Sequence, residues 1–193
     1  MENNKDNKNF KENHDNKNKN KFLAKVWDFI KSFAAIFIIV FALKHFVIDL
    51  TAVSGHSMDH TLATGDIMLV DKISKNFGKK YKRGDIVIFN SPTEPWKLYV
   101  KRVVGLPGEN VEIKDGDVYI DFEKLDEDYL DKGMVTEPTS DIVGWYVGED
   151  QYFLLGDNRV KSNDSRNFGP VSRDYFMGEA LMRVYPFDRL KTY

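Results

Sequence analysis

The sequence predicts a mainly β domain preceded by one transmembrane α-helix. Three observations support this fold class: a polar segment at the start, one long apolar stretch, and several short β-branched and aromatic runs in the remainder. The chain has 193 residues, enough for one globular domain with appended sequence. We expect a tail over residues 1–24, a membrane helix over 25–50 and a β domain over 51–193.

The first part of the chain is almost wholly polar. Residues 1–21 are rich in Asn and Lys, and Phe10 is their only bulky apolar residue. Such a segment buries too little apolar surface to offset the entropy lost on ordering, so we predict a disordered tail. A nucleic-acid-binding arm fits less well, because four carboxylates dilute the lysines.

An apolar stretch follows this tail. Residues 32–43 form an uncharged core, and Lys31 and Lys44 at its ends can extend their ammonium groups toward the membrane surfaces. The apolar character continues to Ile48. A span starting at Phe29 therefore reaches the roughly 20 residues that a bilayer requires.

Two other interpretations of this stretch fit less well. A cleavable signal peptide needs a small-residue cleavage site after its apolar core, but Lys44, His45 and Phe46 stand there. A buried helix that is apolar on all sides would need a larger protein to cover it. Seven lysines precede Trp27, so the positive-inside rule predicts a cytoplasmic N-terminus and an extracytoplasmic β domain.

The chain after residue 50 is predicted to be mostly β. Its β-branched and aromatic runs are bounded by Gly, Asp, Asn and Pro, and residues 114–117 have the composition of a hairpin turn. Short strands at this spacing favour a barrel-like or sandwich domain over a βαβ arrangement. Residues 122–150 are acidic and turn-rich, so we expect a small inserted subdomain around 110–150. The predicted strands lie within residues 66–73, 85–90, 98–105, 110–121 and 151–157.

The composition excludes several kinds of site. The chain has no cysteine, which rules out disulfides, thiolate metal sites and cysteine nucleophiles. Lys and Arg number 28 against 30 Asp and Glu, so the formal net charge is −2. No overall positive field attracts a polyanion, and we expect no nucleic-acid partner.

The segment from Ser54 to Leu62 is the first candidate site. Its Ser57 needs a base to act as a nucleophile, but residues adjacent in sequence rarely aim at each other as a nucleophile and base must. A turn with solvated histidines is the simpler interpretation. His56 and His60 also have a spacing suited to zinc, but Ser57 stands where that pattern requires Glu and no third ligand is evident. We predict no metal and no cofactor.

Lys101 interrupts a strand of apolar character, residues 98–105. A lysine there normally points outward, because strand residues alternate between faces. Turned inward, it would lose its charge more easily: burial lowers the lysine pKa from about 10.4, and the neutral amine can act as a base.

The polar segment Gly156–Arg166 follows another apolar strand. It offers an ion pair between Asp164 and Arg166, and a second between Asp157 and either Arg102 or Arg159. A solvated loop is the simpler interpretation of this composition alone. Residues 82–89 indicate a turn into a strand with a structural role.

In their order along the chain, these segments resemble one known family. One N-terminal span followed by SGHSMDHTL, KRGDIVIF, YVKRVVGLPGE and GDNRVKSNDSRNFGPV is similar to the bacterial type I signal peptidases, over roughly residues 25–188. The short interval between Gly108 and Gly156 resembles the compact Gram-positive members.

The resemblance implies a Ser/Lys dyad. Ser57 matches the family's nucleophile and Lys101 its general base, while Ser162 matches the serine whose hydroxyl orients the lysine amine. The Ser57 backbone N–H would hold the oxyanion. The acyl-enzyme would then be hydrolysed by water activated by the same amine.

Further positions match supporting roles in the family. Asp164 and Arg166 match an ion pair, and Asp157 is similar to a second acid near the dyad. The pockets for the small residues of an A-x-A cleavage motif would be lined by Val53, Met58, Leu62 and Val100.

The resemblance also implies a function: a membrane-bound serine endopeptidase that removes signal peptides from exported preproteins as they emerge from the secretion channel. The protein would lie in the plasma membrane, in contact with lipid through a single helix, with its N-terminus in the cytoplasm and its catalytic domain on the extracytoplasmic face.

Two positions depart from the family pattern, and three other functions stay open. His60 stands where Pro is usual, and Gly55 where some members have a hydroxyl as a second oxyanion donor, so Ser54 or a backbone group must substitute.

The alternative functions are a self-cleaving repressor-type Ser/Lys protease, a signal-peptidase-like assembly factor for surface proteins without cleavage activity, and a single-span protein with a ligand-binding β domain. The span and the charge balance disfavour the first, intact Ser57 and Lys101 the second, and the motifs the third.

Overall fold

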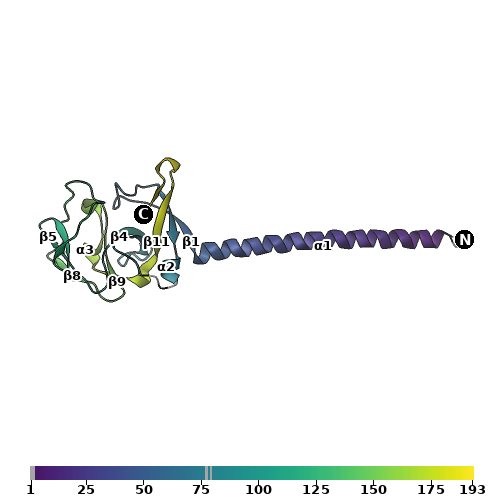
Figure 1. The fold of residues 1–193 in the computed structure, drawn as a ribbon, viewed down its shortest axis with the longest axis horizontal. Helices are drawn as coiled ribbons and strands as arrows, with labels where there is room; N and C mark the ends of the chain where they lie inside the picture. The colour runs from purple at the N-terminus through teal and green to yellow at the C-terminus, as the bar shows by residue number, and fades with distance from the viewer. Residues whose placement is uncertain (1–2, 77, 79) are drawn as a thin grey trace. The chain divides into compact units, whose positions relative to one another are not determined.

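The computed structural model describes residues 3–76, 78 and 80–193 (Figure 1). The chain divides into two units, Met1–His45 and Phe46–Tyr193. Within the described residues, the first unit is formed by helix α1 (Asn3–Phe46) up to His45, and the second contains all the strands. The predicted fold class, mainly β with one N-terminal apolar helix, is therefore confirmed.

Part of α1 has the length and composition of a membrane span. Lys25–Phe46 comprises 22 residues and is, within the described part of the chain, the one helix apolar and long enough to cross a bilayer. At 1.5 Å per residue it measures about 33 Å, against roughly 30 Å for the hydrocarbon layer. Its large apolar side chains, such as Trp27, Phe33 and Phe37, are exposed, as expected for side chains that face lipid.

The boundaries of this helix differ from the prediction at both ends. α1 ends at Phe46 and strand β1 (Ile48–Ala52) begins two residues later, so the predicted span over 25–50 is too long. Apolar residues such as Ile48 suit a helix and a strand equally, and here antiparallel pairing with β2 selects the strand. The helical backbone also continues back to Asn3, where a disordered tail is predicted. No Gly or Pro precedes Gly55 to interrupt it.

The larger sheet holds the segments that carry the candidate site residues. Across the described residues it has eight strands, ordered β1-β2-β11-β3-β4-β9-β10 with β12 paired to β11, and every pairing is antiparallel. Its members after β1 are β2 (Ile67–Asp71), β3 (Ile86–Asn90), β4 (Leu98–Gly105), β9 (Gln151–Leu155), β10 (Val171–Ser172), β11 (Phe176–Tyr185) and β12 (Lys191–Thr192).

Strand β4 lies between β3 and β9 and changes character along its length. Its first three residues, Leu98 to Val100, are exposed or half-buried, whereas Lys101 to Gly105 are buried. β3 pairs with β4 from Leu98 to Arg102, but β9 joins only from Arg102 onward. The start of β4 is therefore open on one side, next to Lys101.

A smaller four-stranded sheet occupies the segment predicted as an inserted subdomain. Figure 1 shows its strands β5 and β8 on one side of the domain and β1 and β11 on the other. Val111 and Val118 of this sheet share one core cluster with Val104 and Phe153 of the larger sheet, which joins the two sheets. Its order is β7-β6-β5-β8, with β5 (Asn110–Lys114), β6 (Asp117–Ile120), β7 (Glu123–Lys124) and β8 (Gly144–Tyr146).

The longest strand, β11, lies outside the predicted strands. It pairs with β2, β3 and β12 and so lies inside the larger sheet. Its Gly178 packs directly on β2: a Cβ atom there would lie 2.3 Å from the Asp71 carbonyl oxygen. The remaining elements are the short helices α2 (Ile73–Asn76) and α3 (Ser165–Phe168) and the 3₁₀ turns η1 (Arg159–Lys161), η2 (Arg173–Tyr175) and η3 (Phe187–Arg189).

Candidate active site

Ser57 lies on the loop between β1 and β2, which is closed at its neck and anchored in the core. The Val53 N–H donates to the Asp66 carbonyl at 2.8 Å, and the Gly65 N–H donates to the Val53 carbonyl at 3.0 Å. Immediately after Ser57, the side chain of Met58 is 2% exposed and packs in the cluster formed by β2 and β3. The loop therefore presents a half-buried serine on a fixed backbone.

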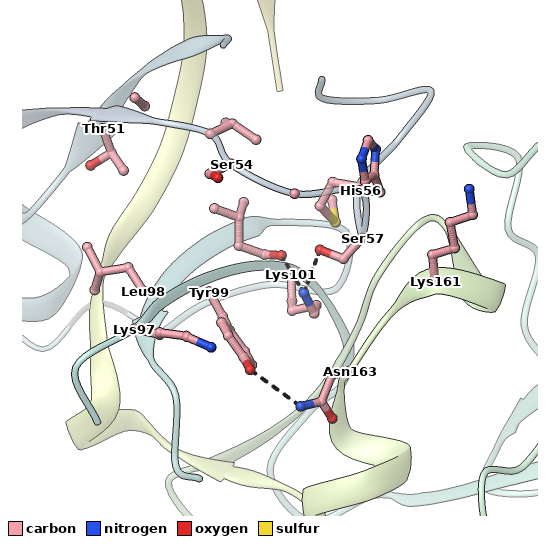
Figure 2. A pocket seen from close by; sticks show the side chains of 15 residues that line it. Thr51, Ser54, His56, Ser57, Lys97, Leu98, Tyr99, Lys101, Lys161 and Asn163 are labelled. Carbon is pink, nitrogen blue, oxygen red and sulfur yellow. Dashed lines mark hydrogen bonds between the residues drawn. The ribbon is translucent and has the colours of Figure 1, made fainter. Parts of the chain in front are cut away.

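Lys101 of β4 points toward this serine. Its Nζ lies 2.7 Å from Ser57 Oγ and 3.0 Å from the Val100 carbonyl oxygen, and Figure 2 shows the two side chains meeting in the cleft. The residue is 2% exposed, and Nζ lies 5.1 Å from the centre of the Tyr99 ring. Burial lowers the pKa of the Lys101 amine to about 8, against opposing attraction from Asp164 and Asp157.

The next residue on the strand, Arg102, lies in an ion pair. Its Nε and one terminal nitrogen donate to the two carboxylate oxygens of Asp157 at 2.9 and 2.6 Å. Burial opposes the guanidinium charge, but the hydrogen bonds to Asp157 raise the Arg102 pKa above its ordinary value. Thr61 of the serine loop donates its hydroxyl to the same carboxylate at 2.5 Å. Of the two partners considered for Asp157, Arg102 is the one that binds it. Asp157 in turn connects Arg102 to the Ser57 loop through Thr61.

Arg159 pairs with a residue that the sequence did not indicate. Its guanidinium binds Glu127, from the turn-rich segment between β7 and β8, and donates to Thr136 and the Gly156 carbonyl. Tyr129 donates its hydroxyl to the same Glu127, and its ring lies 4.0 Å from the Arg102 guanidinium carbon. These contacts connect the inserted segment to the strand end that carries Asp157.

The predicted pair of Asp164 and Arg166 is confirmed. Two guanidinium nitrogens of Arg166 lie 2.8 and 2.9 Å from the two Asp164 oxygens, and both residues are buried. Asp164 is also the N-cap of α3 and accepts the Gly156 N–H at 3.2 Å. This ion pair fixes the backbone of the segment next to the dyad.

Ser162 is brought to the site without the expected bond. Its hydroxyl oxygen is buried and has no hydrogen-bond partner among the described residues, so no bond joins it to Lys101 in this conformation. It lies against Gly156, where a Cβ atom would be 2.2 Å from Ser162 Oγ and 2.4 Å from the Ser57 carbonyl oxygen. A glycine is thus required for the polar segment to approach the serine loop so closely.

The two histidines have other partners. His56 Nδ1 lies 3.0 Å from Asp59 Oδ2, and His60 Nε2 lies 2.9 Å from Asp131 Oδ2, so each imidazole is turned to a different carboxylate. Throughout the described segments, no group of three or more His, Cys, Asp or Glu side chains could hold a metal ion. His60 has φ of 78°, which a proline ring cannot adopt. The turn after Ser57 therefore differs from one built on proline.

A cleft of about 480 Å³ opens at the dyad (Figure 2). Three of the four predicted pocket residues, Val53, Met58 and Val100, line it together with Ser57 and Lys101. Leu62 is not among the residues that line the cleft: its side chain is 1% exposed and packs in the core cluster with Met58, and its contact with substrate stays a prediction. Residues not predicted that also line the cleft include Thr51, Lys97, Leu98, Tyr99, Lys161 and Asn163.

Known proteins that are similar to this chain are signal peptidases. The family described as signal peptidase, peptidase S26, matches residues 26–185. Signal peptidase I P of Bacillus subtilis subsp. natto is 34% identical over 171 residues, covering 85% of this chain and 91% of the relative. Signal peptidase IB of Staphylococcus aureus (strain Mu50) is 33% identical over 178 residues, covering 85% and 92%.

A solved structure is also similar. The crystal structure of a signal peptidase I from Enterococcus faecalis V583 has 38% sequence identity and a TM-score of 0.42, covering 52% of this chain and 97% of the other. The family match extends over most of the chain and includes both Ser57 and Lys101. This chain therefore belongs to the signal peptidase family S26, whose members are serine endopeptidases.

Proposed function

We propose that this protein is a type I signal peptidase that removes signal peptides from exported preproteins, with Ser57 as nucleophile and Lys101 as general base. The observation that carries the proposal is the 2.7 Å approach of the Lys101 amine to the Ser57 hydroxyl inside a cleft. Membership of the signal peptidase family gives the substrate class. The assembly-factor alternative has no comparable support.

The reaction follows from the properties of these two groups. The neutral Lys101 amine accepts the Ser57 proton as Oγ attacks the carbonyl carbon before the scissile bond. The tetrahedral intermediate collapses, the C–N bond breaks, and the lysine returns the proton to the leaving amine. Water then attacks the acyl-enzyme carbonyl carbon and gives a proton to the same amine. The C–Oγ bond breaks, the Lys101 ammonium returns that proton to Ser57 Oγ, and the signal peptide leaves with a new terminal carboxyl group. The Ser57 backbone N–H is the proposed donor to both oxyanions.

The apolar residues at the dyad have two proposed roles. Val53, Met58 and Val100 line the cleft and would accept the small side chains of an A-x-A motif. Apolar surroundings also deprive the Lys101 ammonium of hydration, which favours its neutral form. Ser162 is proposed to orient the lysine amine during the reaction, with the Asp164–Arg166 and Asp157–Arg102 pairs holding the surrounding backbone.

The membrane arrangement is a further part of the proposal. Lys25–Phe46 would cross the plasma membrane once, with the lysine-rich N-terminus in the cytoplasm and the β domain outside. Preproteins emerging from the secretion channel would then meet the cleft on the extracytoplasmic face.

A cleavage assay tests the proposal. Full-length protein purified in detergent is mixed with a preprotein that carries an A-x-A motif, and the product is identified by mass. Cleavage after the motif is expected, with loss in Ser57→Ala and in Lys101→Ala, retention in Lys114→Ala as a matched control, and no effect of a metal chelator. Cleavage that survives in Lys101→Ala would refute the dyad. No cleavage by the unaltered protein would favour the assembly-factor alternative.

A further inference from the structure

The cleft has two chemically different ends, with Ser57 and Lys101 between them. Figure 2 shows Thr51 and Leu98 on one side of the dyad, and His56 and Lys161 on the other. Val53 and Val100, the proposed contacts for the small residues before the scissile bond, line the same cleft and lie two positions after Thr51 and Leu98. The second side is polar and basic, and the proposed function does not yet use it.

The position of Lys161 is fixed by contacts with the nucleophile loop. The Asn158 N–H donates to the Ser57 carbonyl oxygen at 3.0 Å, so η1 begins directly against the serine backbone. The Asn158 side-chain oxygen accepts the Lys161 N–H at 3.2 Å and caps this turn. The Lys161 side chain therefore projects from a rigid turn beside Ser57.

Lys161 has no acidic partner of its own. Its side chain is exposed, and among the described residues no carboxylate lies within salt-bridge distance of its Nζ. Of the other two lysines that line the cleft, Lys101 binds Ser57 and Lys97 binds Glu94 at 2.5 Å. The imidazole of His56 is turned to Asp59. Lys161 is thus available to an acidic group of a bound peptide.

We propose that Lys161 forms a basic subsite that binds an acidic side chain, Asp or Glu, at the first or second position after the scissile bond. This inference rests on the proposed function: if residues before the bond lie along Val53 and Val100, the mature part of the substrate leaves the cleft past Ser57, where Lys161 stands. The subsite would select among preproteins by the start of their mature sequence.

The expected preference is modest, because an exposed ion pair contributes little in water. A substrate with Asp at the second position after the scissile bond should be cleaved about threefold more efficiently than one with Ser there. A substrate with Lys at the same position should be cleaved least efficiently. The difference should lie in KM and should shrink as salt is added.

Charge reversal tests the subsite. The full-length protein and its Lys161→Gln and Lys161→Glu variants are assayed in detergent against three preproteins that differ only in Asp, Ser or Lys at this position. Lys161→Gln should remove the preference and Lys161→Glu should invert it, while Lys114→Glu, a matched change at an exposed lysine that ends strand β5, should keep the original order.

The outcomes separate the two proposals. Equal cleavage of the three preproteins by the unaltered protein, or an unchanged order in Lys161→Glu, would overturn the subsite and leave the Ser57–Lys101 mechanism intact. Absence of cleavage of all three preproteins by the unaltered protein would overturn the proposed function itself, and the subsite with it.

Discussion

Lys101 and Arg102 are neighbouring basic residues on strand β4, and both are buried. They differ in their partners and in the direction in which their pKa values shift. Their exposed fractions are 2% and 8%. Arg102 binds both oxygens of Asp157, and these contacts raise its pKa. The Lys101 amine hydrogen-bonds to a hydroxyl and a carbonyl oxygen and to no carboxylate, and burial lowers its pKa to about 8.

The comparison shows that burial alone does not decide the charge of a basic residue. A cation with a carboxylate in direct contact keeps its proton, whereas one with neutral partners loses it more readily. Strand alternation turns the two side chains to opposite faces, so one strand serves both purposes. The paired Arg102 holds the Ser57 loop through Asp157 and Thr61, whereas the Lys101 amine has no carboxylate in direct contact.

The strongest test of this contrast gives position 101 the chemistry of position 102. In Lys101→Arg the guanidinium stays protonated at any usable pH, so cleavage of a preprotein should fall at least about 1,000-fold. The measurement is kcat/KM, with Lys114→Arg as the matched control. Substantial remaining activity would show that Lys101 is not the base.

Breaking the ion pair between Arg102 and Asp157 should mainly affect the stability of the fold. Asp157→Asn leaves the buried Arg102 without a charged partner and should lower the free energy of unfolding by about 3–5 kcal/mol, measured by denaturant titration in detergent. The double variant Arg102→Met with Asp157→Leu should recover part of this loss. If the losses in the single variants Arg102→Met and Asp157→Leu simply add up to the loss in the double variant, the pair is not coupled.

Replacing Lys101, by contrast, should raise the free energy of unfolding. The folded-state pKa of about 8 lies below the ordinary 10.5, so below pH 8 both states are protonated and the buried charge costs the fold roughly 3 kcal/mol. Lys101→Met should therefore be inactive but more stable than the unaltered protein at pH 7, by up to about that amount. The gain should disappear as pH rises from 8 to 10.5. A Lys101→Met variant that is less stable at pH 7 would contradict the burial argument.

Sequence patterns predicted local elements better than long-range partners. Strand β4 has the predicted bounds because β-branched and aromatic residues flank Lys101 and Arg102 on both sides, and the Lys114–Asp117 hairpin is present. β11 was missed because Gly178 and Ala180 weaken its β-propensity, whereas pairing on both sides makes it a strand.

The same limit applies to the site. Ser57, Lys101 and the Asp164–Arg166 pair could be predicted, because family motifs or short spacing mark them. The choice of Arg102 for Asp157, and the contact of Arg159 with Glu127, could not be predicted, because the partners lie 55 and 32 residues apart. The packing of Leu62 in the core and not along the cleft could not be predicted either, because an apolar residue near a candidate nucleophile suits a pocket and a core equally well.

The smallest expected effect concerns Ser162, which lies against Gly156 beside the Ser57 loop. Its hydroxyl has no hydrogen-bond partner among the described residues, so Ser162→Ala should change the free energy of unfolding by no more than about 1 kcal/mol. Cleavage should nevertheless fall by about tenfold if the hydroxyl orients the lysine amine during turnover. Unchanged cleavage would remove Ser162 from the mechanism.

The pH dependence of kcat/KM tests most directly whether Lys101 reacts as a neutral amine. Only the deprotonated lysine can accept the Ser57 proton, so cleavage should rise with pH through a single limb near 8. Asp157→Asn removes a charge that raises this pKa and should move the limb to lower pH. A limb near 10.4, the value of an exposed lysine, would contradict the account.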